Sequence, residues 1–208
     1  DFSGSNLNRP LGVSLDSICQ SFSGVFHGNG HSIKGLRMNN TNNPWYKNAG
    51  LFCSLKDATV ENLVIDSSCS FTGNSAGALS ESVSGSLTVI NTANKATVNG
   101  KYKIGGFIGY VEKLKQQTVI SFEGCLNDGT VTGSSYAGGF VGYIPSGPNM
   151  AITFFNSTNN ALVTGNSNAG GFVGYIIYYY NTQSMSLEIT NSANKGSVSA
   201  KKDMACGF

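Results

Sequence analysis

Few side chains in this 208-residue sequence could carry out catalysis, and carboxylates are the first to consider. Asp57, Glu61 and Asp66 are its most closely spaced acids. Two carboxylates held about 5–10 Å apart can cleave a glycosidic bond, but Glu61 and Asp66, five residues apart on a strand, point to opposite faces. The other acids considered are isolated along the chain: Glu123, Asp128 and Glu188. We therefore predict solvated surface acids, no catalytic residues and no enzyme activity.

A metal site is the second chemical possibility, because His27 and His31 form a His-x-x-x-His pattern around Gly28-Asn-Gly30. Such a site needs a third ligand, and no nearby carboxylate or cysteine is obvious. The five cysteines fit no metal-binding spacing, and their odd number leaves at least one unpaired within the chain: Cys19, Cys53, Cys69, Cys125 and Cys206. We predict a plain Gly-rich turn at the histidines, cysteines that behave as small buried hydrophobic residues, and no metal or cofactor.

The charge pattern bears on the class of partner. Charged residues make up 12% of the chain, the net charge is +2, and the 13 basic residues are scattered. No basic stripe of the kind that binds nucleic acid is present. The sequence also contains no apolar run long enough to span a bilayer. We predict neither a nucleic-acid partner nor a membrane span.

The elements that would position these side chains come from an internal repeat. The motif Ala-Gly-Gly-Phe-Val-Gly-Tyr occurs at 137–143 and 169–175, with looser copies at 49–52, 76–79, 104–110 and 205–208. Its aligned positions form a marker column spaced by 27 to 36 residues: Phe52, Leu79, Phe107, Phe140, Phe172 and Phe208. An asparagine column lies upstream, with a valine four residues after each member: Asn94, Asn127, Asn159 and Asn194, then Val98, Val131, Val163 and Val198.

Each repeat contains three short segments of alternating residues, such as 87–89, 97–99 and 106–108. A single coil of this kind cannot bury its apolar side chains, whereas stacked coils can. The sequence predicts an all-β, right-handed parallel β-solenoid with three strands per coil. We expect one domain over 1–208, with a divergent region at 1–48 and repeats at 49–208. The marker column should be an internal core ladder. The asparagines should form either a second ladder, bonded from coil to coil, or ordinary turns.

The chain also resembles a known family. The stretches 22–36 and 58–65, followed by Asn127-Asp-Gly-Thr-Val-Thr-Gly133 and Ala137–Tyr143, are similar to the GLUG-motif repeat family of secreted surface proteins. The copy at 76–79 departs from the pattern, since it lacks the Gly-Gly pair. The resemblance implies an adhesin-like protein outside the cell or at its surface, and it brings no catalytic residues.

The repeat length varies only after the motif tyrosine, in the segments 111–118, 144–150 and 176–186. Insertions at one corner of a solenoid commonly build its binding face, although loops there also tolerate insertion without any role. From these segments we predict a recognition surface: Tyr178, Tyr179, Tyr180, Lys113 and Lys115.

A second surface flanks the valine column, where Thr and Ser recur on alternate residues: Thr97 and Asn99, Thr130 and Thr132, Leu162 and Thr164, Ser197 and Ser199. Such an array could order water at an ice surface, although Leu162 and Asn99 interrupt it. Asn39 and Asn156 lie in Asn-x-Thr sequences and would be glycosylated after eukaryotic secretion, Asn39 the more readily.

We predict a non-enzymatic extracellular module that serves as a rigid spacer, an adhesion module or a subunit of a surface filament. Its partner would be a protein or a carbohydrate at a cell surface. The sequence stops within a motif copy, so the strand edges at the solenoid ends could also pair with another copy. The alternative function is a carbohydrate-active enzyme with a β-helix fold, which would need acids gathered in one groove. Ice binding is a further, less favoured alternative.

Overall fold

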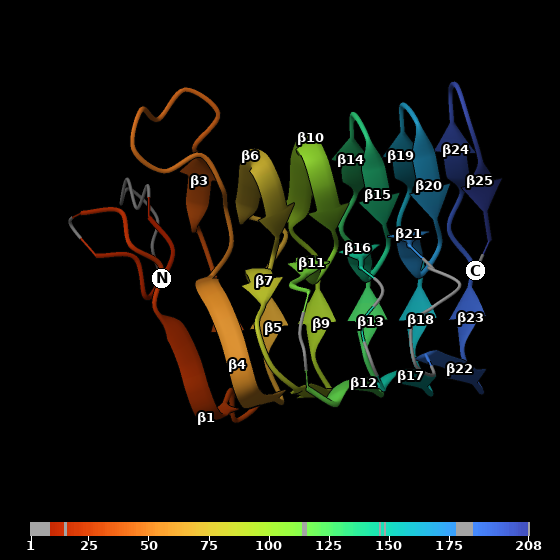
Figure 1. Cartoon of the computed structure of the whole chain (residues 1–208), viewed down its shortest axis with the longest axis horizontal. Coiled ribbons are helices and arrows are strands. Elements are labelled where there is room, and N and C mark those ends of the chain that lie inside the picture. Colours follow the sequence, from red (N-terminus) through yellow and green to blue (C-terminus); the bar gives the residue numbers. More distant parts are fainter. Residues whose placement is uncertain are drawn as a thin grey trace.

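In the computed structural model the chain is a stack of parallel β-strands (Figure 1). The structure describes residues 9–14, 16–113, 116–145, 147, 149–177 and 185–207. Within these ranges all regular secondary structure is β and every pairing between named strands is parallel, so the predicted all-β solenoid is confirmed. No helix in the described part of the chain could cross a membrane.

The strands fall into successive coils. The first two coils contain β1 (Ser21–His27), β2 (Ser32–Ile33), β3 (Arg37–Asn39), β4 (Phe52–Glu61), β5 (Val64–Ile65) and β6 (Ser70–Gly77). The next two contain β7 (Ser80–Val83), β8 (Leu87–Ile90), β9 (Ala93–Asn94), β10 (Thr97–Gly105), β11 (Ile108–Val111), β12 (Thr118–Glu123), β13 (Leu126–Asn127), β14 (Val131–Gly133) and β15 (Tyr136–Gly138). The last two contain β16 (Val141–Ile144), β17 (Met150–Phe155), β18 (Thr158–Asn159), β19 (Val163–Gly165), β20 (Asn168–Gly170), β21 (Val173–Ile176), β22 (Met185–Thr190), β23 (Ala193–Asn194), β24 (Val198–Ala200) and β25 (Ala205–Cys206). The sheet β2-β5-β9-β13-β18-β23 takes one strand from each coil, so the described chain makes about five full turns.

The three faces of the coil differ from those predicted. The long strand β4 pairs with both β7 and β8, so the first and third predicted segments belong to one sheet. The asparagine segment forms a narrow sheet of its own, and the valine segment forms the third sheet. The marker residue lies at the bend between β10 and β11 rather than within a strand. A Cβ atom on Gly106 would collide with the carbonyl oxygen of Gly139 and the amide of Asn127, which explains the glycine beside the marker.

The core is built from two aromatic columns. The rings of Phe107, Phe140 and Phe172 stack at centroid distances of 5.1 Å, and all three side chains are buried, as is Leu79. Phe122 and Phe154 stack at 5.3 Å in the second column and meet Phe140 edge to face. The valine column lies in register across the third sheet. Like residues therefore pack on like residues from coil to coil, and this packing excludes water from the interior.

Phe52 does not belong to the marker column, contrary to the sequence alignment. Its strand partner is Ser80, one residue after Leu79, so Leu51 takes the marker position. Ala49 pairs with Ala76, but Phe52 pairs with Ser80. The corner between these pairs is therefore one residue shorter in the coil of Phe52 than in the next coil. Phe52 is buried in a separate aromatic cluster with Phe22 and Phe26. Phe208, also predicted for the column, lies outside the described residues.

The asparagine column forms an internal ladder. Asn94 Nδ2 donates to Asn127 Oδ1 at 2.9 Å, and Asn127 Nδ2 donates to Asn159 Oδ1 at 2.8 Å. Asn159 continues the ladder to Asn194 at 2.7 Å. The side chains of the first three are buried. Three of the amides also bond across their own corners, because Asn94, Asn159 and Asn194 each donate from Nδ2 to the carbonyl oxygen two residues later. The structure thus shows the coil-to-coil ladder, the first of the two interpretations.

The N-terminal region contributes the first coil, and a short segment before it folds against β4. Leu11 forms a bridge with Phe52, and Cys19 forms a disulfide with Cys53. The expectation of cysteines acting only as small hydrophobic residues is therefore wrong for this pair, whose members are 34 residues apart in sequence and meet only in the fold. Cys69 and Cys125 are buried free thiols, and Cys206 is exposed.

Candidate functional site

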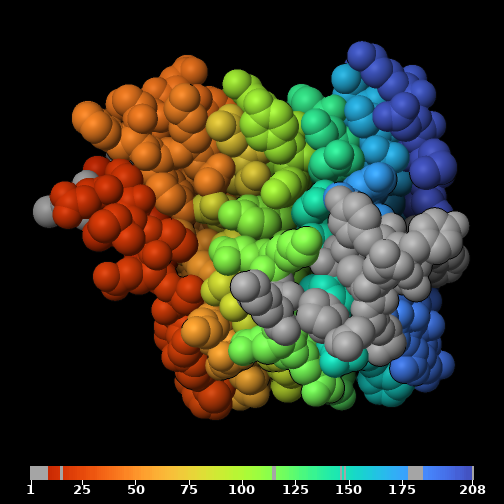
Figure 2. All heavy atoms as spheres, in the orientation of Figure 1, coloured from red at the N-terminus to blue at the C-terminus, as the bar shows by residue number. Residues whose placement is uncertain are grey.

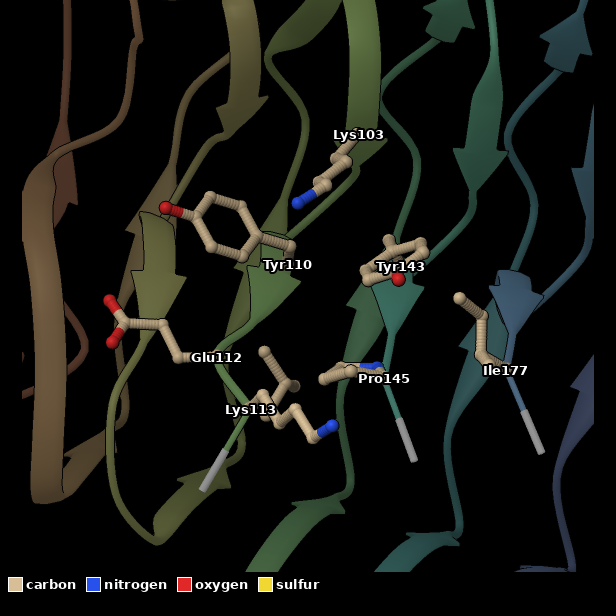
Figure 3. Close-up of a pocket in the computed structure, with 8 residues that line it drawn as sticks. Lys103, Tyr110, Glu112, Lys113, Tyr143, Pro145 and Ile177 are labelled. Carbon is tan, nitrogen blue, oxygen red and sulfur yellow. The ribbon is translucent and has the colours of Figure 1, made fainter. Parts of the chain in front are cut away.

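A groove of about 410 Å³ runs across three successive coils and carries both aromatic and charged groups. Figure 2 shows these coils side by side in sequence order, and Figure 3 shows the groove itself. The strands β10, β11 and β16 and the residues that follow β11, β16 and β21 supply its lining: Lys103, Tyr110, Val111, Glu112, Lys113, Tyr143, Pro145 and Ile177. The groove therefore lies at the corner where the insertions begin.

The motif tyrosines come to this corner through the strand register. Tyr110 pairs with Tyr143, and Tyr143 pairs with Tyr175, on adjacent strands of one sheet. Ile108 and Val111 on the same strand are buried, whereas Tyr110 is only partly buried. We call Tyr110, Tyr143 and Tyr175 the tyrosine row. Because equivalent residues of stacked coils repeat at about 4.8 Å, the row follows the solenoid axis.

A lysine is inserted into the tyrosine row. Lys103 Nζ lies 4.3 Å from the ring centroid of Tyr110 and 4.6 Å from that of Tyr143, within the range of cation–π contacts. One coil later the residue in register with Lys103 is Tyr136, whose ring centroid lies 4.7 Å from that of Tyr175. The register shifts by one residue between Gly100 and Lys103 relative to β6, whereas the next coil keeps the spacing of β10, with Gly133 and Tyr136 at the equivalent positions.

A buried carboxylate lies next to this row. Glu81 from β7 is 5% exposed, beneath the loop that joins β3 to β4. Asn48 Nδ2 donates to Glu81 Oε1 at 2.6 Å, and the Tyr46 hydroxyl donates to Glu81 Oε2. Asn43 shapes the loop, because its Oδ1 accepts hydrogen bonds from the backbone N–H groups of residues 45 and 46. The loop thus provides two donors for a carboxylate that water hardly reaches.

Burial and neighbouring charge shift the ionisation of this cluster. Burial raises the pKa of Glu81 to about 7, and the hydrogen bonds from Tyr46 and Asn48 oppose the shift. Burial, followed by the charges of Glu81 and Glu112, raises the pKa of Tyr110 to about 12. Burial lowers the pKa of Lys103, and the charge of Glu112 acts in the opposite direction. Lys103 is therefore a partly desolvated cation.

The predicted recognition residues are only partly covered by the described chain. Lys113 lines the groove, whereas Lys115 and Tyr178–Tyr180 lie outside the described residues. Sequence reasoning overlooked Lys103, Tyr110, Glu112 and Tyr143 as site residues. The signal for the tyrosines was available, because the last residue of the repeated motif is a tyrosine in three successive copies. No periodic signal marked Lys103, because the equivalent positions of the adjacent coils hold Ser75 and Tyr136.

Sequence reasoning also overlooked two acids of adjacent coils, Glu81 and Glu112. Glu112 lines the groove, and its negative charge contributes to the raised pKa of Glu81. Ser82 Oγ donates to Glu112 Oε1 at 3.3 Å. These two acids come from adjacent coils, 31 positions apart in sequence, so no local spacing could show their proximity.

The histidines also have a neighbour that the sequence did not show. His27 Nδ1 lies 2.6 Å from Glu61 Oε1, because His27 and Glu61 are register partners on β1 and β4. His31 lies in the turn after Gly30, and Asn29 and Gly30 have positive φ angles. No group of three or more His, Cys, Asp or Glu side chains that could hold a metal ion occurs among the described residues.

The remaining acids shape local backbone or bind polar neighbours. Asp57 has a positive φ angle, and its Oδ1 accepts a hydrogen bond from Ser86 N at 3.0 Å. Asp66 accepts hydrogen bonds from Ser68, which lower the pKa of Asp66. The other acids of interest are exposed: Glu123 and Asp128 at the ends of two consecutive strands of one coil, β12 and β13, and Glu188 two coils later on β22.

The outer positions flanking the valine column lie in register on the third sheet: Asn99, Thr132, Thr164 and Ser199. Both candidate glycosylation sites are exposed. Asn39 ends β3, and its Oδ1 accepts a hydrogen bond from the Thr41 hydroxyl at 2.9 Å. Asn156 has a positive φ angle at the corner after β17.

A crystal structure of a protein from Bacteroides ovatus, described as a putative immunoglobulin A1 protease, is similar to this chain over its whole length. The TM-score is 0.59 and the sequence identity 18%, over 100% of this chain and 70% of that chain. At this identity the similarity shows a shared fold and no shared activity. No protein-family model and no curated protein matches the chain. The GLUG resemblance therefore rests on the quoted motifs alone.

Proposed function

We propose that the chain is a non-enzymatic binding module of an extracellular or cell-surface protein, and that the groove beside the tyrosine row is its recognition site. The observation that carries the proposal is the row itself, with Lys103 held between the rings of Tyr110 and Tyr143. Partly exposed tyrosines offer rigid contact surfaces with an apolar face and a polar end. A groove lined with them suits a partner that is held rather than transformed.

The scaffold supports this role because it fixes the distance between binding groups. The stacked rings of the core and the asparagine ladder join each coil to the next on two sides. Groups on successive coils are thereby held before a partner arrives, which reduces the ordering cost of binding. A rigid spacer or adhesion module needs the same property.

The Cys19–Cys53 disulfide supports an extracellular location, since disulfides persist mainly in oxidising compartments. The resemblance to GLUG-motif surface proteins points the same way. Mass spectrometry of native protein tests this part of the proposal. We expect a linked peptide pair containing both cysteines; fully reduced cysteines in protein taken directly from its source would contradict an extracellular location.

The binding proposal is tested by surface plasmon resonance on immobilised mucin, collagen, fibronectin and cell-wall polysaccharides. The wild-type chain should bind at least one of these surfaces. Tyr143→Ala removes the central ring of the row and should weaken that binding by about 2 kcal/mol, roughly 30-fold, if Tyr143 is a hot spot. Tyr102→Ala is the matched control, because Tyr102 is an exposed tyrosine on β10 that does not line the groove.

Circular dichroism melting of both variants would separate lost binding from lost folding. The proposal fails if the wild-type chain binds none of the surfaces, or if the Tyr143 and Tyr102 variants both bind as the wild type does. Loss of binding in a Thr132→Ala variant alone would move the site to the hydroxyl-bearing third sheet, where an ice surface is the alternative partner.

A carbohydrate-active enzyme is the second candidate, and the observation that favours it is a pair of acids on adjacent coils, Glu112 in the groove lining and the buried Glu81 on β7. Glycoside hydrolysis uses two carboxyl groups on either side of the scissile bond. The test is release of reducing ends from the same polysaccharides. Release that disappears in both Glu81→Gln and Glu112→Gln would establish the enzyme; no release by the wild-type chain would leave the binding module.

Self-association through the solenoid ends is a separate part of the proposal, in keeping with a filament subunit. In the described chain β1 pairs with β4 alone, and Leu11, Phe22, Phe26 and Phe52 line an apolar hollow of about 380 Å³ at that end. Unpaired strand edges next to apolar surface favour pairing with another chain. Light scattering after size exclusion should show concentration-dependent oligomers, and a monomer at all concentrations would contradict this part.

A further inference from the structure

The charges of the groove indicate which kind of ligand it accepts, and this step rests on the binding function proposed above. Two ammonium groups and one carboxylate line the groove, from Lys103, Lys113 and Glu112. In Figure 3 the ammonium group of Lys103 reaches between Tyr110 and Tyr143, that of Lys113 extends toward the Pro145 side, and the carboxylate of Glu112 points away from both. Glu112 is also engaged by Ser82 Oγ at 3.3 Å. The middle of the groove therefore favours an anionic group.

Of the two lysines, Lys103 gives the stronger argument for an anionic ligand. Its ammonium group lies over the rings of Tyr110 and Tyr143, and no carboxylate within 4.0 Å of it is found in the described chain. An aromatic ring attracts a cation but does not neutralise its charge. Burial also lowers the pKa of Lys103, which shows that the protein solvates this ammonium group less well than water does. An anion that reached Lys103 would replace the missing solvation.

The walls of the groove favour a sugar chain over a peptide. The groove extends across three coils, which corresponds to about 10 Å at the usual strand spacing, long enough for more than one sugar ring. The flat faces of sugar rings pack against tyrosine rings, and two of these rings line the groove. A peptide added as a β-strand needs a free strand edge. The strands beside the groove, β11 and β16, are already paired on both sides.

We propose that the groove binds an acidic oligosaccharide whose carboxylate-bearing sugar lies between Lys103 and Lys113 and packs against Tyr110 and Tyr143. A uronic acid unit has this chemistry: a ring with apolar C–H faces and one carboxylate at its edge. The carboxylate meets the two ammonium groups, and the ring meets the tyrosines.

The experiment uses two tetrasaccharide probes, one from polygalacturonate and one from hyaluronan, each with its carboxyl-reduced, neutral counterpart. Isothermal titration calorimetry gives the Kd of each probe. At least one acidic probe should bind about tenfold or more tightly than its neutral counterpart, the difference expected for one charge-assisted contact. Lys103→Gln should remove this preference while leaving the neutral probe unchanged. Lys195→Gln is the matched control, since Lys195 is exposed at the corner after β23 and does not line the groove.

A second variant, Lys113→Gln, keeps the test valid if Lys103→Gln fails to fold. It should weaken the acidic probe and spare the neutral one. Equal binding of acidic and neutral probes, lost in Tyr143→Ala, would overturn the inference of an acidic ligand but leave the binding groove intact. Acidic binding that survives Lys103→Gln, Lys113→Gln and Tyr143→Ala would place the anion elsewhere and also overturn it.

Failure of both acidic probes to bind at about 1 mM would overturn the inference as well. The proposed binding function would then be judged separately, by whether the chain still attaches to a protein surface in a Tyr143-dependent way. Binding of oligoglutamate in place of the sugars would identify an acidic peptide as the ligand and refute the saccharide.

Discussion

Replacing Asn127 with alanine should destabilise the middle of the solenoid. Asn127 is fully buried, accepts a hydrogen bond from Asn94 Nδ2 at 2.9 Å and donates one to Asn159 Oδ1 at 2.8 Å. Alanine removes the donor to the buried Asn159 Oδ1 and leaves Asn94 Nδ2 with only its bond to Ala96 O. Each buried polar group that loses its partner costs about 1–3 kcal/mol. Allowing for some relaxation, we expect the free energy of unfolding to fall by about 3 kcal/mol, which lowers Tm by about 6–12 °C for a chain of this size.

Urea unfolding followed by far-UV circular dichroism measures this change. Asn160→Ala is the matched control, because Asn160 is exposed and its Nδ2 bonds Asp128 on the surface at 2.8 Å. We expect this control to change stability by no more than about 0.5 kcal/mol. A decrease in the m-value of Asn127→Ala would indicate that the two halves of the stack unfold separately. Equal, small effects of both substitutions would refute the idea that the asparagine ladder joins the coils.

Three further predictions concern the core, a buried acid and the disulfide. Phe140→Ala removes a ring that stacks on two others and should cost about 3–5 kcal/mol in a melting or urea experiment, whereas Phe155→Ala, on an exposed side chain, should cost far less. Because burial raises the pKa of Glu81 from its ordinary 4.5 to about 7, the native state retains a proton that the unfolded state has released in this range. The free energy of unfolding should therefore fall as pH rises from 4.5 to 7, by up to about 3 kcal/mol. Glu81→Gln should flatten the dependence of Tm on pH over this range. If the variant's Tm changed with pH as much as that of the wild type, Glu81 would not be the group responsible. Replacing Cys19 and Cys53 together by serine opens a loop of 34 residues and should lower stability by about 2–4 kcal/mol, and unchanged urea unfolding would show that the disulfide adds nothing.

The sequence by itself determined the solenoid and most of its ladders. In a stack of parallel coils, each residue packs on the residue at the same position in the next coil, so the contacts repeat with the period of the sequence. Asn94, Asn127 and Asn159 therefore stand out as a column in the amino-acid sequence alone. The alignment failed at Phe52, because a corner shortened by one residue shifts the register, and a loose copy of the motif does not reveal so small a change.

Only the tertiary structure decided the composition of the groove. Lys103 stands where the adjacent coils have Ser75 and Tyr136, and Glu81, beside the groove, is buried by a loop from the previous coil. The disulfide joins Cys19 to a strand that begins 33 residues later. None of these features repeats along the chain, so periodicity carries no information about them. A repeating sequence specifies its own scaffold because every coil must satisfy the same packing, whereas contacts that occur once depend on where the folded chain places them.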